Sequence, residues 1–243
     1  MPLSSSATSA DGVYGLMLRA KWLGKWPKDV LRELAETATL KSYPDGTLLH
    51  RANRKLTQMW IVGSGALELR FDGGNGKRSI LSYTLPGEEL GFKCVLEDNK
   101  PTYDVFTHGS TSIVHLGRAS LMRVLDRRPE LLWTWVEVLS LQLKRTSDYI
   151  AYSTTSKIRE RLAYQLFVMI DNSPGADDVE INVKLSQERL ASILGTCRQD
   201  VNREFGWLKA QGIVSYRAGR ISILNLDRLK QTFAPGSASW AGS

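Results

Sequence analysis

Cysteine is scarce in this chain. Its 243 residues include two cysteines, Cys94 and Cys197, which stand far apart in the sequence. Two separated thiols give neither a disulfide framework nor the ligand spacing of a zinc finger. An iron–sulfur cluster needs about four cysteine ligands, so this cofactor is excluded by the count.

Long apolar runs and paired histidines are also missing. No segment approaches the ~18 apolar residues of a membrane span, and the N-terminus lacks the apolar core of a signal peptide. We therefore expect a cytoplasmic protein with no membrane partner. His50, His108 and His115 form no helical metal-binding pair, so we expect structural histidines instead of haem or metal ligands. No nucleophile–base pattern indicates an enzyme.

The chain does have enough apolar side chain for compact cores, and it carries an excess of positive charge. Hydrophobic residues make up 42% of it, with seven tryptophans and a formal net charge of +7. Between Lys184 and Arg220, seven Lys and Arg stand against three Asp and Glu. Basic charge concentrated in one segment favours a polyanionic partner.

That basic segment has the pattern of two helices followed by a short two-stranded wing. Ser186 is a suitable N-cap for the first helix, and Gly195 stands where a left-handed residue commonly ends one. The second helix begins near Cys197 and carries an apolar stripe, which consists of Val201, Phe205 and Leu208. Two helices joined by such a turn are typical of DNA binding, although a solvated helical hairpin has the same local pattern.

Four polar residues of the second helix stand between the positions of its apolar stripe, where they face away from the core. They are Arg198, Gln199, Asn202 and Arg203. Arginine can donate two hydrogen bonds to guanine, and glutamine can pair with adenine. We expect these side chains to read bases, with Lys184, Ser186, Arg217 and Arg220 holding phosphates.

The segment resembles the winged helix-turn-helix of the Crp/Fnr family. That family begins its recognition helix Ser-Arg-Glu-x-Val-x-Arg, and this chain has Cys197-Arg198-Gln199-Asp200-Val201-Asn202-Arg203. The resemblance implies that Arg198 and Arg203 read guanines, and Gln199 replaces the usual glutamate. It also implies double-stranded DNA with an inverted repeat, a homodimer, and RNA polymerase as a partner.

Upstream, residues 41 to 116 change to a period of two, with short apolar strands separated by glycine-rich turns such as 63–65. The segments YPDGTLLHRA and MWIVGSGALEL resemble the cyclic-nucleotide-binding β-roll.

In cyclic-AMP binders a glutamate binds the ribose and an Arg-Ser pair binds the phosphate. This chain has Phe92 after Gly91, and Thr102-Tyr103 in place of Arg-Ser. A buried anion without a cation is costly, so we do not expect cyclic AMP; another ligand at these four residues, or none, stays open.

The remaining segments are helical in pattern. Residues 130–152 are apolar on more than one face, with Leu131, Trp135 and Val138 near heptad spacing. In the Crp/Fnr family this helix dimerises, and the alternative is a single buried core helix. We expect a further helix through Ile170 with Thr154 or Ser156 as its cap, and a last helix from Leu226 to Phe233.

Together these features predict an α+β protein with an N-terminal β-roll, a long dimerisation helix and a C-terminal winged helix-turn-helix. The expected parts are a partly disordered arm, the β-roll, the dimerisation helix, the DNA-binding domain and a flexible tail, at residues 1–26, 27–128, 129–152, 153–234 and 235–243. An alternative function is a ligand sensor that acts through a protein partner. Cys197, at a helix N-terminus, is either a plain N-cap or a site of redox control.

Overall fold

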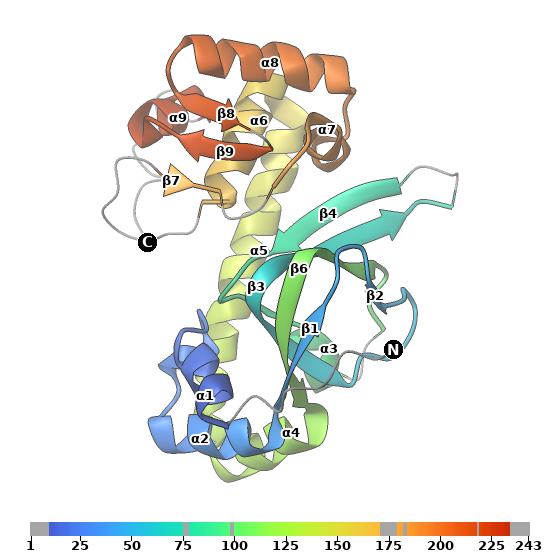
Figure 1. Ribbon diagram of the computed structural model, residues 1–243, viewed down its shortest axis with the longest axis vertical. Helices are drawn as coiled ribbons and strands as arrows, with labels where there is room; N and C mark the ends of the chain where they lie inside the picture. The colour runs from blue at the N-terminus through green and yellow to red at the C-terminus, as the bar shows by residue number, and fades with distance from the viewer. Residues whose placement is uncertain are drawn as a thin grey trace. The chain divides into compact units, whose positions relative to one another are not determined.

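The computed structural model divides the chain into two compact units, an N-terminal unit that ends at Lys144 and a C-terminal unit that begins at Arg145 (Figure 1). It describes residues 10–74, 78–97, 100–170, 179–181, 184–217 and 219–233. The predicted tail, 235–243, and the first nine residues of the predicted arm therefore lie outside the described residues.

An antiparallel sheet forms the centre of the N-terminal unit. Its strand order is β1-β6-β3-β4, and β2 pairs with β6 while β5 pairs with β3. The strands are β1 (Thr39–Tyr43), β2 (Leu48–His50), β3 (Gln58–Asp72), β4 (Arg78–Thr84), β5 (Glu89–Leu90) and β6 (Asp104–Gly117). The period of two in this region thus predicted the sheet, because successive side chains point to opposite faces.

Alternation along β3 builds two cores on opposite faces of the sheet. Met59 and Ile61 pack into the cluster beneath the helices, whereas Trp60 and Val62 pack into the cluster inside the roll. Residues 63–65, predicted as a turn, lie within β3, and the pairing with β6 shifts its register there. A bulge explains the difference, since it inserts extra residues without ending the strand.

Helices cover the first of these cores. They are α1 (Ala10–Leu18), α2 (Lys28–Thr37), α4 (Arg118–Arg127) and the start of α5 (Leu132–Thr155), with short 3-10 turns at Leu23–Lys25 (η1) and Pro129–Leu131 (η2). Trp135 of α5 stacks on Phe92, with ring centroids 3.4 Å apart, and meets Trp26 edge-on at 6.2 Å. Aromatic contacts of this kind add to the stabilisation from burial.

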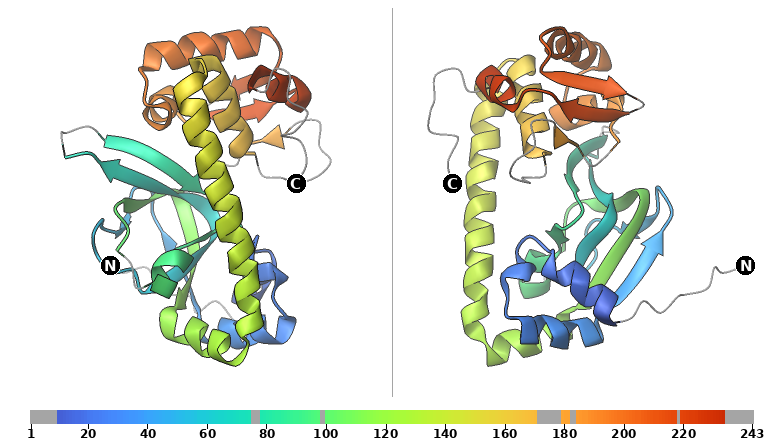
Figure 2. Two further views of the ribbon diagram at one scale, coloured as in Figure 1. Left: turned by 180° about the vertical axis from the view of Figure 1, so that it is seen from behind. Right: turned by 60° about the vertical axis from the view of Figure 1, so that its left-hand side comes forward.

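The structure adds to and corrects several local predictions for this unit and for the start of the next one. Ala10–Leu18 of the predicted arm forms α1, and the helix α3 (Phe92–Glu97) was missed. Leu131, Trp135 and Val138 form the face of the long helix that is buried in the unit's own core, and their burial leaves the predicted pairing of another face untested. Because α5 extends to Thr155, neither Thr154 nor Ser156 caps the next helix, which begins after Lys157. Figure 2 shows α5 as one continuous helix.

The C-terminal unit is a helical bundle with a small sheet in the order β7-β9-β8. Its elements after α5 are α6 (Ile158–Val168), β7 (Val179–Glu180), α7 (Gln187–Leu194), α8 (Arg198–Ala210), β8 (Val214–Arg217), β9 (Arg220–Ile223) and α9 (Leu226–Phe233). Leu162, Phe205 and Leu208 are fully or almost fully buried at its centre. The predicted bounds of α9 are confirmed.

Candidate nucleic-acid interface

Helices α7 and α8 are joined by a three-residue turn. The Ser186 hydroxyl oxygen accepts a hydrogen bond from the Arg189 amide at 3.3 Å and caps α7, as predicted. Gly195 then adopts a φ of 62°, a left-handed conformation that ends the helix. After Thr196 and Cys197 the chain enters α8, so the sequence between Ser186 and Ala210 forms a helix-turn-helix.

One side of α8 is buried and the other is exposed. The predicted stripe is confirmed, because Val201, Phe205 and Leu208 are each at most 2% exposed. The four side chains predicted to read bases, Arg198, Gln199, Asn202 and Arg203, are all exposed. At 100° per residue these four positions span an arc of about 140° around the helix, so they share one face.

Both arginines of this face meet acidic side chains. Arg198 forms an ion pair of 2.8 Å with Glu188 of α7, and Arg203 pairs with Asp200 at 3.0 Å and Glu204 at 2.9 Å. Arg198 and Glu188 are both more than half exposed, so their pair contributes little to stability. It can therefore open easily when a stronger partner for the guanidinium arrives.

Asn202 is also contacted from α7. The Gln187 side-chain amide donates a hydrogen bond to the Asn202 Oδ1 atom at 3.1 Å. With its oxygen already accepting, Asn202 keeps its amide nitrogen as the free donor for a base acceptor. The role of Gln187 was not predicted, because a pair across the turn leaves no pattern in the local sequence.

Basic and hydroxyl groups flank this face, where phosphates were predicted to bind. The Ser186 oxygen caps α7, and its hydroxyl donates to the nearby Glu188 carboxylate, an exposed partner that a phosphate could replace. In the wing, Arg217 and Arg220 are direct cross-strand partners, and both are exposed. Lys184 is exposed next to the wing turn, where the Leu185 amide donates to the Gly219 carbonyl at 2.9 Å.

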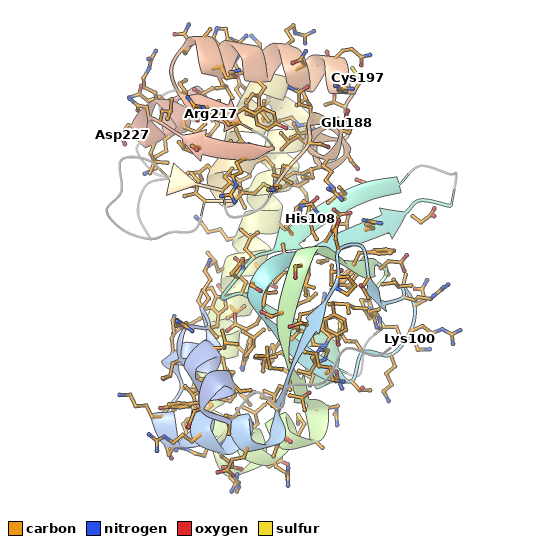
Figure 3. The ribbon with its side chains drawn as sticks, viewed as in Figure 1. Lys100, His108, Glu188, Cys197, Arg217 and Asp227 are labelled. Atoms are coloured by element: carbon orange, nitrogen blue, oxygen red, sulfur yellow. The ribbon has the colours of Figure 1, made fainter. Side chains whose placement is uncertain are left out.

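Cys197 is exposed and stands immediately before α8 (Figure 3). Its thiol makes no capping bond to the helix backbone, but it donates a hydrogen bond to Asp200 at 3.2 Å. Asp200 also accepts from the Thr196 hydroxyl at 3.0 Å, and these two donors hold its pKa below the usual value. Redox control through Cys197 stays a prediction.

The four residues of the predicted effector site lie in two different places. Gly91 has a φ of 97°, and a Cβ atom there would come within 2.8 Å of the Gln58 carbonyl oxygen. Phe92 points into the cluster beneath the helices, whereas Tyr103 packs against the cluster inside the roll. Thr102 is exposed. Burial raises the pKa of Tyr103 to about 12, so its hydroxyl stays protonated.

Glu89, two residues before Gly91, contacts the backbone at the start of η1. One carboxylate oxygen accepts hydrogen bonds from the backbone amides of Trp22 and Leu23, at 2.9 and 2.7 Å. The other oxygen is buried without a hydrogen-bond partner among the described residues. Burial raises the pKa of Glu89 to about 7 despite those amide bonds. No sequence pattern predicted this residue's role.

The three histidines lie on the sheet, and the rings of His50 and His115 both meet the Trp60 ring edge-on, with centroids 6.5 and 5.9 Å away. His115 contacts the Tyr43 hydroxyl and the Gln58 amide oxygen, each at 2.9 Å, and burial lowers its pKa to about 4. His50 contacts the Arg54 carbonyl at 3.1 Å, and His108 lies 3.9 Å from Glu68. Across the described parts of the chain, no three His, Cys, Asp or Glu side chains gather as metal ligands would.

Comparisons with known proteins match both units. A family model described as "Crp-like helix-turn-helix domain" matches residues 160–232, and one described as "Cyclic nucleotide-binding domain" matches residues 40–128. The nitrogen fixation regulation protein FixK of Bradyrhizobium diazoefficiens is 23% identical over 203 residues, which are 82% of this chain and 84% of that protein. The chain belongs to the Crp/Fnr family.

Other Crp/Fnr proteins share this similarity. The CRP-like cAMP-activated global transcriptional regulator of Mycobacterium tuberculosis is 22% identical over 178 residues, 70% of this chain and 80% of that protein. The structure of FixK2 from Bradyrhizobium japonicum has a TM-score of 0.71 at 21% identity, and the match covers 82% of this chain and 99% of that one. These relatives are transcription regulators and not enzymes, and this Crp/Fnr protein is of the same type. Among its described residues, no helix is long and apolar enough to span a membrane.

Proposed function

We propose that this Crp/Fnr protein binds an inverted-repeat DNA operator as a homodimer and that it does so without cyclic AMP. The observation that carries the proposal is the exposed face of α8, where two arginines and two amides stand together above a buried apolar stripe. A helix of this kind fits the major groove, where arginine reads guanine and amide side chains read adenine or cytosine.

The groups around α8 suit the phosphate backbone. The Ser186 hydroxyl belongs to the first turn of the motif, and Arg217 and Arg220 extend from the paired strands of the wing. Contacts to phosphate fix the position of a protein on the duplex, while contacts to base edges supply specificity. In this division of roles Arg198, Gln199, Asn202 and Arg203 choose the operator.

The homodimer is supported by an apolar seam along α5. Leu132, Val136, Leu139 and Leu143 follow each other at spacings of four, three and four residues, and Ile150 continues the line seven residues later. All five side chains are exposed, from 37% for Leu132 to 70% for Leu143. A heptad seam of this kind is buried when a second helix packs against it. Two-fold symmetry would place the recognition helices about 34 Å apart, one turn of DNA.

Independence from cyclic AMP is supported by the residues predicted as the effector site. Phe92 is buried against Trp135 and so cannot offer a polar group to a ribose. Neither Thr102 nor Tyr103 carries a positive charge to pair with a cyclic phosphate. The stacking of Phe92 on Trp135 also joins the turn at Gly91 to α5 with side chains of the protein itself, so we expect no ligand to be needed for DNA binding.

The test is selection of bound DNA from a random pool by the purified protein, with and without added cyclic AMP. We expect the same inverted repeat to be enriched in both samples, and the variant Arg198→Ala/Arg203→Ala to enrich none. Enrichment only with cyclic AMP would contradict the proposed independence. No enrichment in either sample would contradict the proposed DNA binding and favour a protein partner.

A further inference from the structure

A buried acid stands behind one of the exposed arginines of α8. Glu204 is 8% exposed, and both of its carboxylate oxygens accept hydrogen bonds from arginine. The Nε atom of Arg203 donates to one oxygen at 2.9 Å, and the Nε atom of Arg159 donates to the other at 2.8 Å. A carboxylate removed from water needs such charged partners to remain ionised.

Arg159 is itself held in place. It extends from α6, and its guanidinium lies 4.0 Å from the centre of the Trp207 ring, over the face of the indole. The cation–π attraction to the ring adds to the ion pair with Glu204 and restricts the guanidinium further. Burial alone would raise the pKa of Glu204, but the hydrogen bonds from Arg203 and Arg159 outweigh it and lower the pKa. Glu204 is therefore a fixed anion.

Asp200 holds the same arginine from the other side. One of its oxygens lies 3.0 Å from the Nη2 atom of Arg203. Its other oxygen accepts from the Thr196 hydroxyl and the Cys197 thiol, which belong to the turn between α7 and α8. Arg203 is thus connected to α6 through Glu204 and to the turn through Asp200.

We propose that Glu204 and Asp200 are positioning residues that hold Arg203 in its base-reading orientation before DNA is bound. The inference rests on the proposed function. Glu204 uses the Nε proton of Arg203, and Asp200 uses one proton of Nη2. The Nη1 protons and the second Nη2 proton remain, and they can donate together to the O6 and N7 atoms of guanine. Arg203 therefore reads guanine with the end of its guanidinium.

Arg198 provides the contrast within the same helix. Its partner Glu188 is 55% exposed in its side chain, and the described structure shows no buried group behind that pair. Glu188 is therefore not expected to orient Arg198. The substitution Glu188→Gln removes an acid of the same charge from the same surface, which makes it a matched control for Glu204→Gln.

The experiment measures binding of full-length protein to the selected operator and to its single base-pair substitutions. We expect Glu204→Gln and Asp200→Asn each to lower discrimination by about tenfold at the base pair that Arg203→Ala identifies, because a loosely held arginine tolerates other bases. Three further quantities are measured for each variant: discrimination at the remaining base pairs, the salt dependence of binding and the melting temperature. A merely structural role would change all three together or none of them.

The outcomes separate the two proposals. If Glu204→Gln and Asp200→Asn both keep full discrimination at the Arg203 base pair, the positioning role is refuted. It is equally refuted if both variants weaken binding to every operator alike, or if Glu188→Gln produces the same change at that base pair. If the unsubstituted protein itself shows no preference for any operator, it is the proposed function that fails.

Discussion

The buried carboxyl of Glu89 should make the stability of the N-terminal unit depend on pH, and the substitution Glu89→Gln should remove that dependence. Glutamine keeps an oxygen to accept from the Trp22 and Leu23 amides, but it cannot ionise. The side-chain amide nitrogen of the variant would take the place of the second carboxylate oxygen, which is buried and has no hydrogen-bond partner among the described residues. An unsatisfied amide lowers the stability of the variant by an amount that does not change with pH.

The size of the effect follows from the difference between the pKa of Glu89 in the folded and the unfolded protein. Burial raises this pKa from 4.5 to about 7, so the folded protein binds a proton that the unfolded chain has already lost. Because the folded pKa is raised, this contribution to stability is full below pH 4.5 and is lost as the pH rises through 7. A tenfold difference in proton affinity corresponds to about 1.4 kcal/mol, which gives a loss of roughly 2 kcal/mol between pH 5.5 and 8.

Urea unfolding followed by tryptophan fluorescence at several pH values measures this difference. His115 also changes stability with pH, in the opposite sense, because its lowered pKa makes stability fall as the pH drops from 6.5 toward 4. That contribution is common to both proteins and cancels when the variant is compared with the unsubstituted chain. Equal changes of stability with pH in the two proteins would refute the role assigned to Glu89.

Three further predictions concern DNA binding and assembly. In a binding assay, Arg203→Ala should make the free energy of operator binding less favourable by roughly 1–3 kcal/mol and relax the preference at one base pair. Equal weakening on every DNA sequence would instead identify Arg203 as a phosphate contact. In sedimentation experiments, Leu143→Glu should convert the homodimer to a monomer, because it places a charge in the apolar seam of α5. The control Lys144→Glu, one residue away from the seam, should remain a dimer. If both variants are dimers, the seam is not the dimer interface. Peroxide should lower DNA affinity by placing a charged group near phosphates, and Cys197→Ser should abolish that response; an unchanged affinity of the unsubstituted protein would end the redox hypothesis.

The local patterns of the C-terminal unit predicted its structure well. The N-cap at Ser186, the left-handed Gly195 and the stripe beginning at Val201 are all features of neighbouring residues, and each is confirmed. Glu204 was missed although it stands three residues after Val201, at the edge of that stripe. A charged residue at such a position is a signal for a buried ion pair, but its partner Arg159 is distant in sequence.

The N-terminal unit was predicted less completely because its contacts are mostly non-local. Residues 63–65 have the composition of a turn, yet long pairing with β6 keeps them in one strand. The period of α5 could not reveal which of its apolar faces meets the sheet and which stays exposed. The Trp135 side chain is buried because it packs against Phe92 and Trp26, and those two residues come from other parts of the chain.

The most direct test of the account changes the spacing of the operator. Binding of the protein to its selected inverted repeat is compared with binding to the same repeat carrying about five additional base pairs, half a turn of DNA, between the half-sites. If two copies read the repeat through α8, the insertion turns one half-site away from its recognition helix, and affinity should fall to that of a single half-site. Equal affinity for both DNAs would contradict recognition by a homodimer with fixed symmetry.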